Sequence, residues 1–304
     1  MNANAINANA MNANAMTVDV EDYFQVEAFA STIDRAEWEH LPRRVDRNTE
    51  RLLDIFAETG VSATFFVLGW IARRHPALVR RIVEEGHELA SHGCDHLRAD
   101  RQSAAAFRTD VRDSKALLEQ MGGVAVAGYR APTFSIGRGS DWAHRILAEE
   151  GYRYSSSVYP LRHDLYGTSG APRTAFAPVD GIVEIPLTTV RLGGIDMPAS
   201  GGGYFRLFPY PVSRWLLARA GRDLAAPGIF YLHPWEIDPQ QPRQLHAPLR
   251  SRFRHYLNLG RTEGRFRRLL RDFAWTRIDR LFLTEASGPF PVVTAWMDRR
   301  LPSP

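Results

Sequence analysis

Cysteine is almost absent from this sequence, because Cys94 is the only one among 304 residues. A single thiol cannot form an internal disulfide, so the fold does not depend on an oxidising compartment. The sequence also lacks an apolar run of about 18 residues, the minimum for a transmembrane helix. Its first residues lack the charged and apolar stretches of a signal peptide. We therefore expect a cytoplasmic protein without a membrane span.

The sequence also lacks a large excess of positive or negative charge. The 38 Lys and Arg residues nearly balance the 34 Asp and Glu residues, which leaves a formal net charge of +4. This excess favours a mildly basic enzyme over a nucleic-acid-binding protein. Hydrophobic residues make up 44% of the chain, enough for the core of one large α/β domain.

The two ends of the chain differ in composition from the rest. Residues 1–15 read MNANAINANAMNANA, a repeat of Asn and Ala that we expect to be disordered. Residues 16–283 then form one domain. Residues 284–304 contain several prolines and mixed polarity, which predicts a loosely attached tail.

Strand and helix patterns alternate along the domain. Short β-branched and aromatic runs predict strands at 17–21, 62–70, 87–91, 128–134, 152–158 and 228–236. Helical spacing of apolar residues predicts helices at 46–58, 76–85, 103–120, 141–150, 211–225 and 262–273. This alternation is typical of a parallel sheet or an α/β barrel.

His92 and His96 lie four residues apart, directly after a predicted buried strand. If the segment turns into a helix, both imidazoles face one side and reach one cation. The alternative is that each histidine is a surface or capping residue. The pair therefore indicates a metal site, although HxxxH alone is only moderately specific.

Three carboxylates, Asp19, Glu21 and Asp22, cluster at the end of the first predicted strand. Such a group is costly unless it is solvated or binds a metal. One interpretation is a polar loop after a strand. The other is that the cluster supplies an anionic metal ligand and a general base.

Two further polar residues follow predicted strands. His233 comes after the buried run IFYL, at the strand end where barrel active sites form. Arg130, in YRAP, needs a carboxylate partner beside an apolar strand. Structural roles, a hydrogen-bonded core histidine and a structural ion pair, remain the alternatives.

Taken in order, several segments resemble the polysaccharide deacetylases of carbohydrate esterase family four, over residues 16–282. The resemblance rests on TVDVED, ATFFVLG, GHELASHGCDH, GYRAPTFS, GYRYSSSVYP and FYLHPWE. The segments DVEDYF, PLRHDLYG and GGGYFRLFP resemble one subgroup further, the deacetylases of exopolysaccharide loci associated with exosortase and PEP-CTERM proteins.

This resemblance implies an α/β fold, a distorted (β/α) barrel of about seven strands. It implies a divalent cation, usually zinc, held by His92, His96 and one acidic residue. It assigns Asp19 as base, Arg130 as the residue that orients it, and His233 as acid. The family usually has two adjacent Asp where this chain reads Asp-Val-Glu-Asp, so the third ligand is either Glu21 or Asp22.

The function implied is removal of N-acetyl groups from the hexosamines of a polysaccharide, in exopolysaccharide biosynthesis. The substrate is an N-acetylated polysaccharide or a lipid-linked oligosaccharide, met at the inner face of the cytoplasmic membrane through peripheral contact. Tyr129, Tyr204 and Trp235 are candidates for stacking on sugar rings, and the alternative for each is a role in the core. The rival functions are hydrolysis of another amide, as in peptidoglycan deacetylases or allantoinases, and carbohydrate binding without catalysis.

Overall fold

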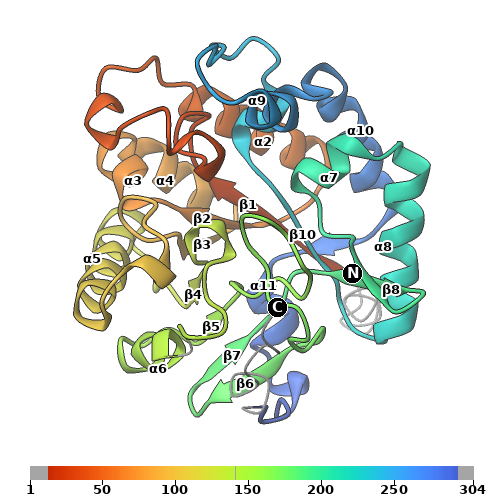
Figure 1. The fold of residues 1–304 in the computed structure, drawn as a ribbon. Helices are drawn as coiled ribbons and strands as arrows, with labels where there is room; N and C mark the ends of the chain where they lie inside the picture. The colour runs from red at the N-terminus through yellow and green to blue at the C-terminus, as the bar shows by residue number, and fades with distance from the viewer. Residues whose placement is uncertain (1–12, 141, 294–304) are drawn as a thin grey trace, which may run out of the picture.

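The computed structural model describes residues 13–140 and 142–293, which fold around one curled sheet (Figure 1). The order of hydrogen-bonded strands is β10-β1-β2-β3-β4-β5-β7-β6, and β11 also pairs with β1. These strands are β1 (Asn14–Val20), β2 (Thr64–Val67), β3 (Glu88–Ser91), β4 (Gly128–Tyr129), β5 (Tyr154–Ser155), β6 (Phe176–Val179), β7 (Ile182–Glu184), β10 (Ile229–Leu232) and β11 (Trp275–Thr276).

The run from β10 through β1, β2, β3, β4 and β5 to β7 is parallel throughout, so it supplies the seven strands expected. Only β6 is antiparallel to its neighbour. Among the described residues β7 and β10 do not pair, and Tyr231 of β10 instead forms a bridge with Gly201, in the segment after the strand that ends at Pro198. The predicted α/β barrel is confirmed as a curled parallel sheet that stays open on this side.

Helices surround the sheet (Figure 1). They are α2 (Val45–Thr59), α3 (Gly69–Arg74), α4 (Pro76–Glu84), α5 (Ala104–Gly122), α6 (Trp142–Glu149), α7 (Gly202–Leu207), α8 (Tyr210–Leu224), α9 (Leu249–Tyr256), α10 (Leu259–Asp272) and α11 (Ile278–Phe282). The hairpin β8 (Thr189–Leu192) and β9 (Ile195–Pro198) forms a separate small sheet. No helix in the described ranges combines the length and apolarity that crossing a bilayer requires.

Helix α2 illustrates how the sequence pattern becomes packing. Its apolar stripe of Leu52, Leu53 and Phe56 is fully buried. The helix ends at Gly60, whose φ of 67° is left-handed and favours glycine.

The first strand begins earlier than the composition predicted. β1 starts at Asn14, inside the Asn-Ala repeat, because Ala15 is fully buried in the sheet and the Asn14 side chain accepts a hydrogen bond from the Gly228 N–H. At the other end, Val292 forms a bridge with Ala177. Residues 1–12 and 294–304, where most of the disordered start and part of the tail were expected, lie outside the described residues.

The carboxyl ends of the parallel strands meet at one edge of the sheet, and this positions the polar residues. Glu21 follows β1, His92 follows β3, Arg130 follows β4 and His233 follows β10. Segments more than 200 residues apart in sequence therefore contribute side chains to one place, as in other barrels.

Candidate active site

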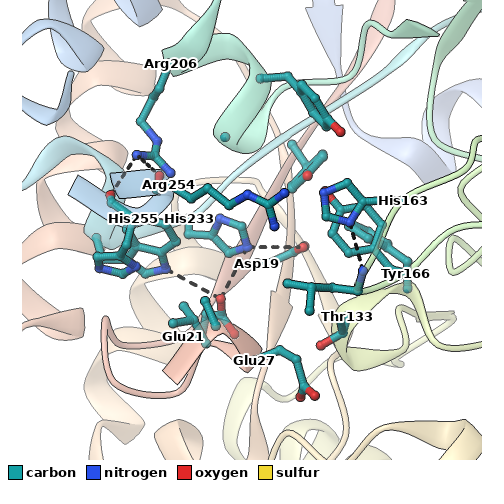
Figure 2. A pocket seen from close by; sticks show the side chains of 18 of the residues that line it. Asp19, Glu21, Glu27, Thr133, His163, Tyr166, Arg206, His233, Arg254 and His255 are labelled. Carbon is teal, nitrogen blue, oxygen red and sulfur yellow. Dashed lines mark hydrogen bonds and ion pairs between the residues drawn. The ribbon is translucent and has the colours of Figure 1, made fainter. Parts of the chain in front are cut away.

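A cavity of about 430 Å³ opens at this edge of the sheet. Asp19, Glu21, His92, His96 and His233 all line it. Figure 2 shows His233 lying between the two carboxylates on one side and Arg254 on the other. The structure therefore brings together five of the seven residues proposed from the sequence.

Glu21, His92 and His96 form the group that could hold a metal ion. Their candidate ligand atoms lie within 4.8 Å of one another, and all three residues are buried. Nδ1 of His92 lies 2.8 Å from the carbonyl oxygen of Arg130, which leaves Nε2 as the free ring nitrogen. Such a second hydrogen bond typically fixes the tautomer of a metal-binding histidine.

The chemistry of these donors fits a divalent cation. Oε2 of Glu21 is buried and lies 2.7 Å from Nε2 of His96, but this close pair lacks the geometry of a hydrogen bond. A buried carboxylate oxygen without a hydrogen bond is costly. Two imidazoles and a carboxylate are a donor set found in catalytic zinc sites, which keep a fourth position open.

The histidine pair does not meet through a helix, as the spacing had suggested. The segment after β3 is a bend in which Gly93 has φ 75° and His96 has φ 53°. The left-handed turn folds the chain back, and the two rings lie 5.4 Å apart. His92 and His96 therefore lie close together as predicted, but the expectation that a helix brings them together was wrong.

Asp22 lies away from the histidines, despite its place beside Glu21. Oδ2 accepts hydrogen bonds from the N–H groups of Arg44 and Val45, at the start of α2, and Oδ1 accepts one from Tyr23. Burial raises the pKa of Asp22 to about 6, against the lowering effect of these hydrogen bonds. Its geometry is that of a helix cap, so of the two candidates Glu21 fits the third ligand position.

Asp19 is paired with Arg130. Nη1 of Arg130 donates to Oδ1 of Asp19 over 2.6 Å, and also to Oγ1 of Thr17 over 2.8 Å. The opposite edge of the guanidinium donates to the carbonyl and the hydroxyl of Ser156. Arg130 is thus held in one orientation, and Oδ2 of Asp19 stays free toward the cavity.

His233 lies next to two of the carboxylates. Its Nε2 is 3.3 Å from Oε1 of Glu21 and 4.0 Å from Oδ2 of Asp19. Its Nδ1 lies 2.7 Å from Oε1 of Glu236. Burial lowers the pKa of His233, but the charges of Glu21, Glu236 and Asp19 outweigh it and raise the pKa to about 9. The ring is therefore protonated at neutral pH.

The sequence interpretation missed Glu236 and Arg206. Nε of Arg206 donates to Oε2 of Glu236 over 2.6 Å, and both side chains are buried. Glu236 is three residues after His233, in HPWE, so an acid at this spacing was the available signal. Arg206 carried no comparable signal, because its partner lies 30 residues away.

The three aromatic residues proposed for sugar stacking have different environments. Tyr129 is fully buried against Phe107 and Tyr152, so it is a core residue. Trp235 lines the cavity but stacks on His233, with ring centroids 5.1 Å apart. Tyr204 lines the cavity and is only partly buried, so it remains the candidate for contact with a sugar.

Two protein families match adjacent segments of this chain. Residues 27–155 match the family "Polysaccharide deacetylase". Residues 156–283 match "Domain of unknown function (DUF3473)". The cavity is shared between them, because the second segment contributes His163, Tyr204, His233 and Arg254.

Known relatives are deacetylases. A chitooligosaccharide deacetylase from Rhizobium leguminosarum bv. trifolii is 31% identical over 155 residues, which is 50% of this chain and 65% of that protein. A peptidoglycan-N-acetylglucosamine deacetylase from Bacillus cereus is 35% identical over 72 residues, 24% of this chain. The chain covers 34% of that second relative.

Solved structures share the fold. A Mycobacterium smegmatis protein described as a polysaccharide deacetylase has a TM-score of 0.59 at 22% identity, covering 96% of this chain and 94% of that one. Puue allantoinase has a TM-score of 0.57 at 16% identity, covering 93% of each chain. The order of motifs, the curled sheet and the family match agree, and residues 27–155 form a polysaccharide deacetylase domain of carbohydrate esterase family four.

Proposed function

We propose that this protein is a metal-dependent N-deacetylase that hydrolyses the acetamido group of a hexosamine in a polysaccharide. The observation that carries the proposal is the placement of Asp19 and His233 beside the group Glu21, His92 and His96, with Nε2 of His233 3.3 Å from Oε1 of Glu21 and 4.0 Å from Oδ2 of Asp19. A base and an acid next to a metal site are what metal-assisted amide hydrolysis requires.

Glu21, His92 and His96 would hold the cation, with zinc favoured by the two imidazoles. A bound zinc ion supplies Lewis acidity, which polarises an amide carbonyl and acidifies water. Asp19 accepts the proton of the attacking water at Oδ2, because Arg130 occupies Oδ1. The ion pair with Arg130 holds the Asp19 carboxylate in place at the cavity.

His233 protonates the leaving amine. An amine leaves poorly unless it is protonated, and the raised pKa of His233 means that the ring carries a proton at neutral pH. Glu236 holds Nδ1, so Nε2 faces the cavity as the donor. Arg206 keeps Glu236 charged from behind, since the two side chains are joined by a hydrogen bond.

We further propose contact with an anionic lipid surface beside the cavity. Leu245, Leu249 and Phe253 are 64%, 79% and 61% exposed, in and just before α9. The side chain of Arg250, on the same helix, is 69% exposed. Apolar side chains next to arginines are typical of helices that lie in a membrane interface. Such contact would present a lipid-linked oligosaccharide to the cavity at the cytoplasmic face, as exopolysaccharide biosynthesis requires.

The tests are acetate release by zinc-loaded protein from chitooligosaccharides and peptidoglycan fragments, and, in parallel, ring opening of allantoin, which releases no acetate. We expect acetate from N-acetylhexosamine oligomers, and none from the His92→Ala variant. The His246→Ala variant is the control, because His246 is exposed and outside the cavity. Turnover of allantoin alone would instead indicate a different amidohydrolase. Glycan binding without metal or acetate release would indicate a non-catalytic protein.

A further inference from the structure

The wall of the cavity opposite the metal ligands carries positive charge that the proposed reaction does not use. Arg250 and Arg254, both on α9, line this wall together with His163. Figure 2 shows Arg254 extending across the mouth of the cavity, between His233 and His163. The residues belong to the segment 156–283, whose family has no assigned function.

Asp164 is the carboxylate that contacts both arginines. Nη1 of Arg254 donates to the two oxygens of Asp164 over 3.1 and 3.0 Å, and Nη1 of Arg250 lies 3.2 Å from Oδ2 of the same residue. Hydrogen bonds from Arg254 lower the pKa of Asp164, so it is ionised and contributes a single negative charge. The wall thus keeps one uncompensated positive charge.

His163 does not change this balance. Burial lowers the pKa of His163 despite its contact with Asp164, so the ring is neutral at pH 7. Its ring stacks on Tyr166, with centroids 4.0 Å apart and nearly parallel planes. The positive charge therefore resides on the two arginines beside an aromatic surface.

Arg254 also has unused hydrogen-bonding capacity. Within the described part of the chain only Nη1 makes hydrogen bonds, which leaves the edge formed by Nε and Nη2 without a protein partner. Two parallel N–H groups on a guanidinium match the geometry of a carboxylate or a phosphate. The side chain is only 36% exposed, so a ligand here would be partly shielded from solvent.

We propose that Arg254, supported by Arg250, binds an anionic group carried by the substrate next to the N-acetylhexosamine that is deacetylated. The shared chemistry is a planar or tetrahedral oxyanion, either the carboxylate of an acidic sugar or the phosphate of a sugar phosphate. This inference rests on the proposed function for its glycan. The carboxylates Asp19, Glu21 and Glu27 line the cavity away from this wall, and they would orient such a substrate by repulsion.

The test measures binding separately from turnover, in zinc-loaded Asp19→Asn protein. The probes are a chitotetraose, a hyaluronan tetrasaccharide that alternates N-acetylglucosamine with glucuronate, and N-acetylglucosamine 1-phosphate against N-acetylglucosamine. Titration calorimetry should show at least one anionic probe binding about tenfold or more tightly than its neutral counterpart, as expected for a charge-assisted hydrogen bond. Tighter binding of the hyaluronan tetrasaccharide than of chitotetraose would identify a carboxylate. Tighter binding of N-acetylglucosamine 1-phosphate than of N-acetylglucosamine would identify a phosphate.

The Arg254→Gln variant should remove this preference, and Arg254→Lys should restore part of it. Arg252→Gln is the matched control, because Arg252 lies on the same helix but outside the cavity. Equal affinity for neutral and anionic probes in the Asp19→Asn protein, or an unchanged preference in Arg254→Gln, would overturn the proposal. A preference in binding without any acetate release by the wild-type chain would refute the proposed function and leave this anion site standing.

Discussion

Arg130 and Asp19 form a buried ion pair, with Nη1 and Oδ1 only 2.6 Å apart and side chains 0% and 3% exposed. The two residues are 111 positions apart in the sequence. Arg130 also donates to Thr17 and Ser156, so its orientation is set by the protein rather than by a ligand. Asp19 is thereby presented to the cavity through one oxygen.

Replacing Asp19 with Asn should abolish turnover while metal content stays unchanged. The amide keeps the shape of the side chain but cannot accept a proton, and loss of a general base costs roughly 10²- to 10⁴-fold in rate. Acetate release and zinc content of the same preparation are the measurements. If zinc is lost together with activity, Asp19 acts as a metal ligand and the assigned role is wrong.

Glu21 and Asp22 should respond oppositely to removal of their charge. Glu21→Gln should lose zinc, since Glu21 is the carboxylate beside His92 and His96. Asp22→Asn should keep zinc, because Asp22 accepts the N–H groups at the start of α2 and lies away from the histidines, and it should cost little stability at pH 7, because burial disfavours the charged carboxylate. Zinc content and urea unfolding distinguish them. The reverse pattern would make Asp22 the ligand.

Glu236→Gln should change the pH dependence of the reaction. Glu236 is one of the carboxylates that raise the pKa of His233 to about 9, so its neutralisation lowers that pKa. Because the acid must be protonated, activity is lost as pH rises through its pKa, and the alkaline limb should move to lower pH. The profile of kcat/KM against pH measures this. An unmoved alkaline limb in a folded variant would exclude His233 as the acid.

Glu88 should make the protein less stable as pH rises. Burial and the nearby charge of Asp279 raise the pKa of Glu88 to about 7, from an ordinary value of 4.5. The native state therefore binds a proton that the unfolded state has released, and stability falls between about pH 4.5 and pH 7. The full loss amounts to about 3 kcal/mol.

Glu88→Gln cannot ionise, so this part of the pH dependence should vanish. Thr64 donates to Oε2 and Tyr154 to Oε1 of Glu88, so the amide oxygen of Gln can accept one of these hydrogen bonds while the other hydroxyl rotates to accept from the amide N–H. Urea unfolding of both proteins at about pH 5 and pH 8 measures the difference. Parallel stability curves for the two proteins would show that Glu88 titrates normally.

Leu249 and Phe253 should contribute to binding of anionic vesicles. The double variant Leu249→Ser and Phe253→Ser removes the apolar contacts while leaving the arginines of α9 in place. Sedimentation with vesicles that contain phosphatidylglycerol should show weaker binding than for the wild type. Val212→Ser, which alters an exposed apolar residue on α8, is the matched control. Equal sedimentation of all three proteins would contradict the membrane contact.

The alternation of apolar strands and amphipathic helices was sufficient to predict a parallel α/β fold. This local pattern shows which residues follow each strand, and the carboxyl ends of parallel strands lie at one edge of the sheet. His92, Arg130 and His233 were therefore recognisable as site candidates from their positions alone. Element ends were less well predicted: β1 begins at Asn14 because pairing with β10 and β11 extends it into the Asn-Ala repeat.

The sequence alone thus indicated the family through the order of its motifs and the parallel α/β fold through local spacing, and it named five charged or titratable residues that line the cavity. Only the tertiary structure decided between Glu21 and Asp22, since adjacent side chains point to different partners once β1 meets the start of α2. It also decided that Arg206 supports Glu236 and that Arg254 lies beside His233 at the cavity. Those contacts join segments that no local pattern connects, and packing around the curled sheet brings them together.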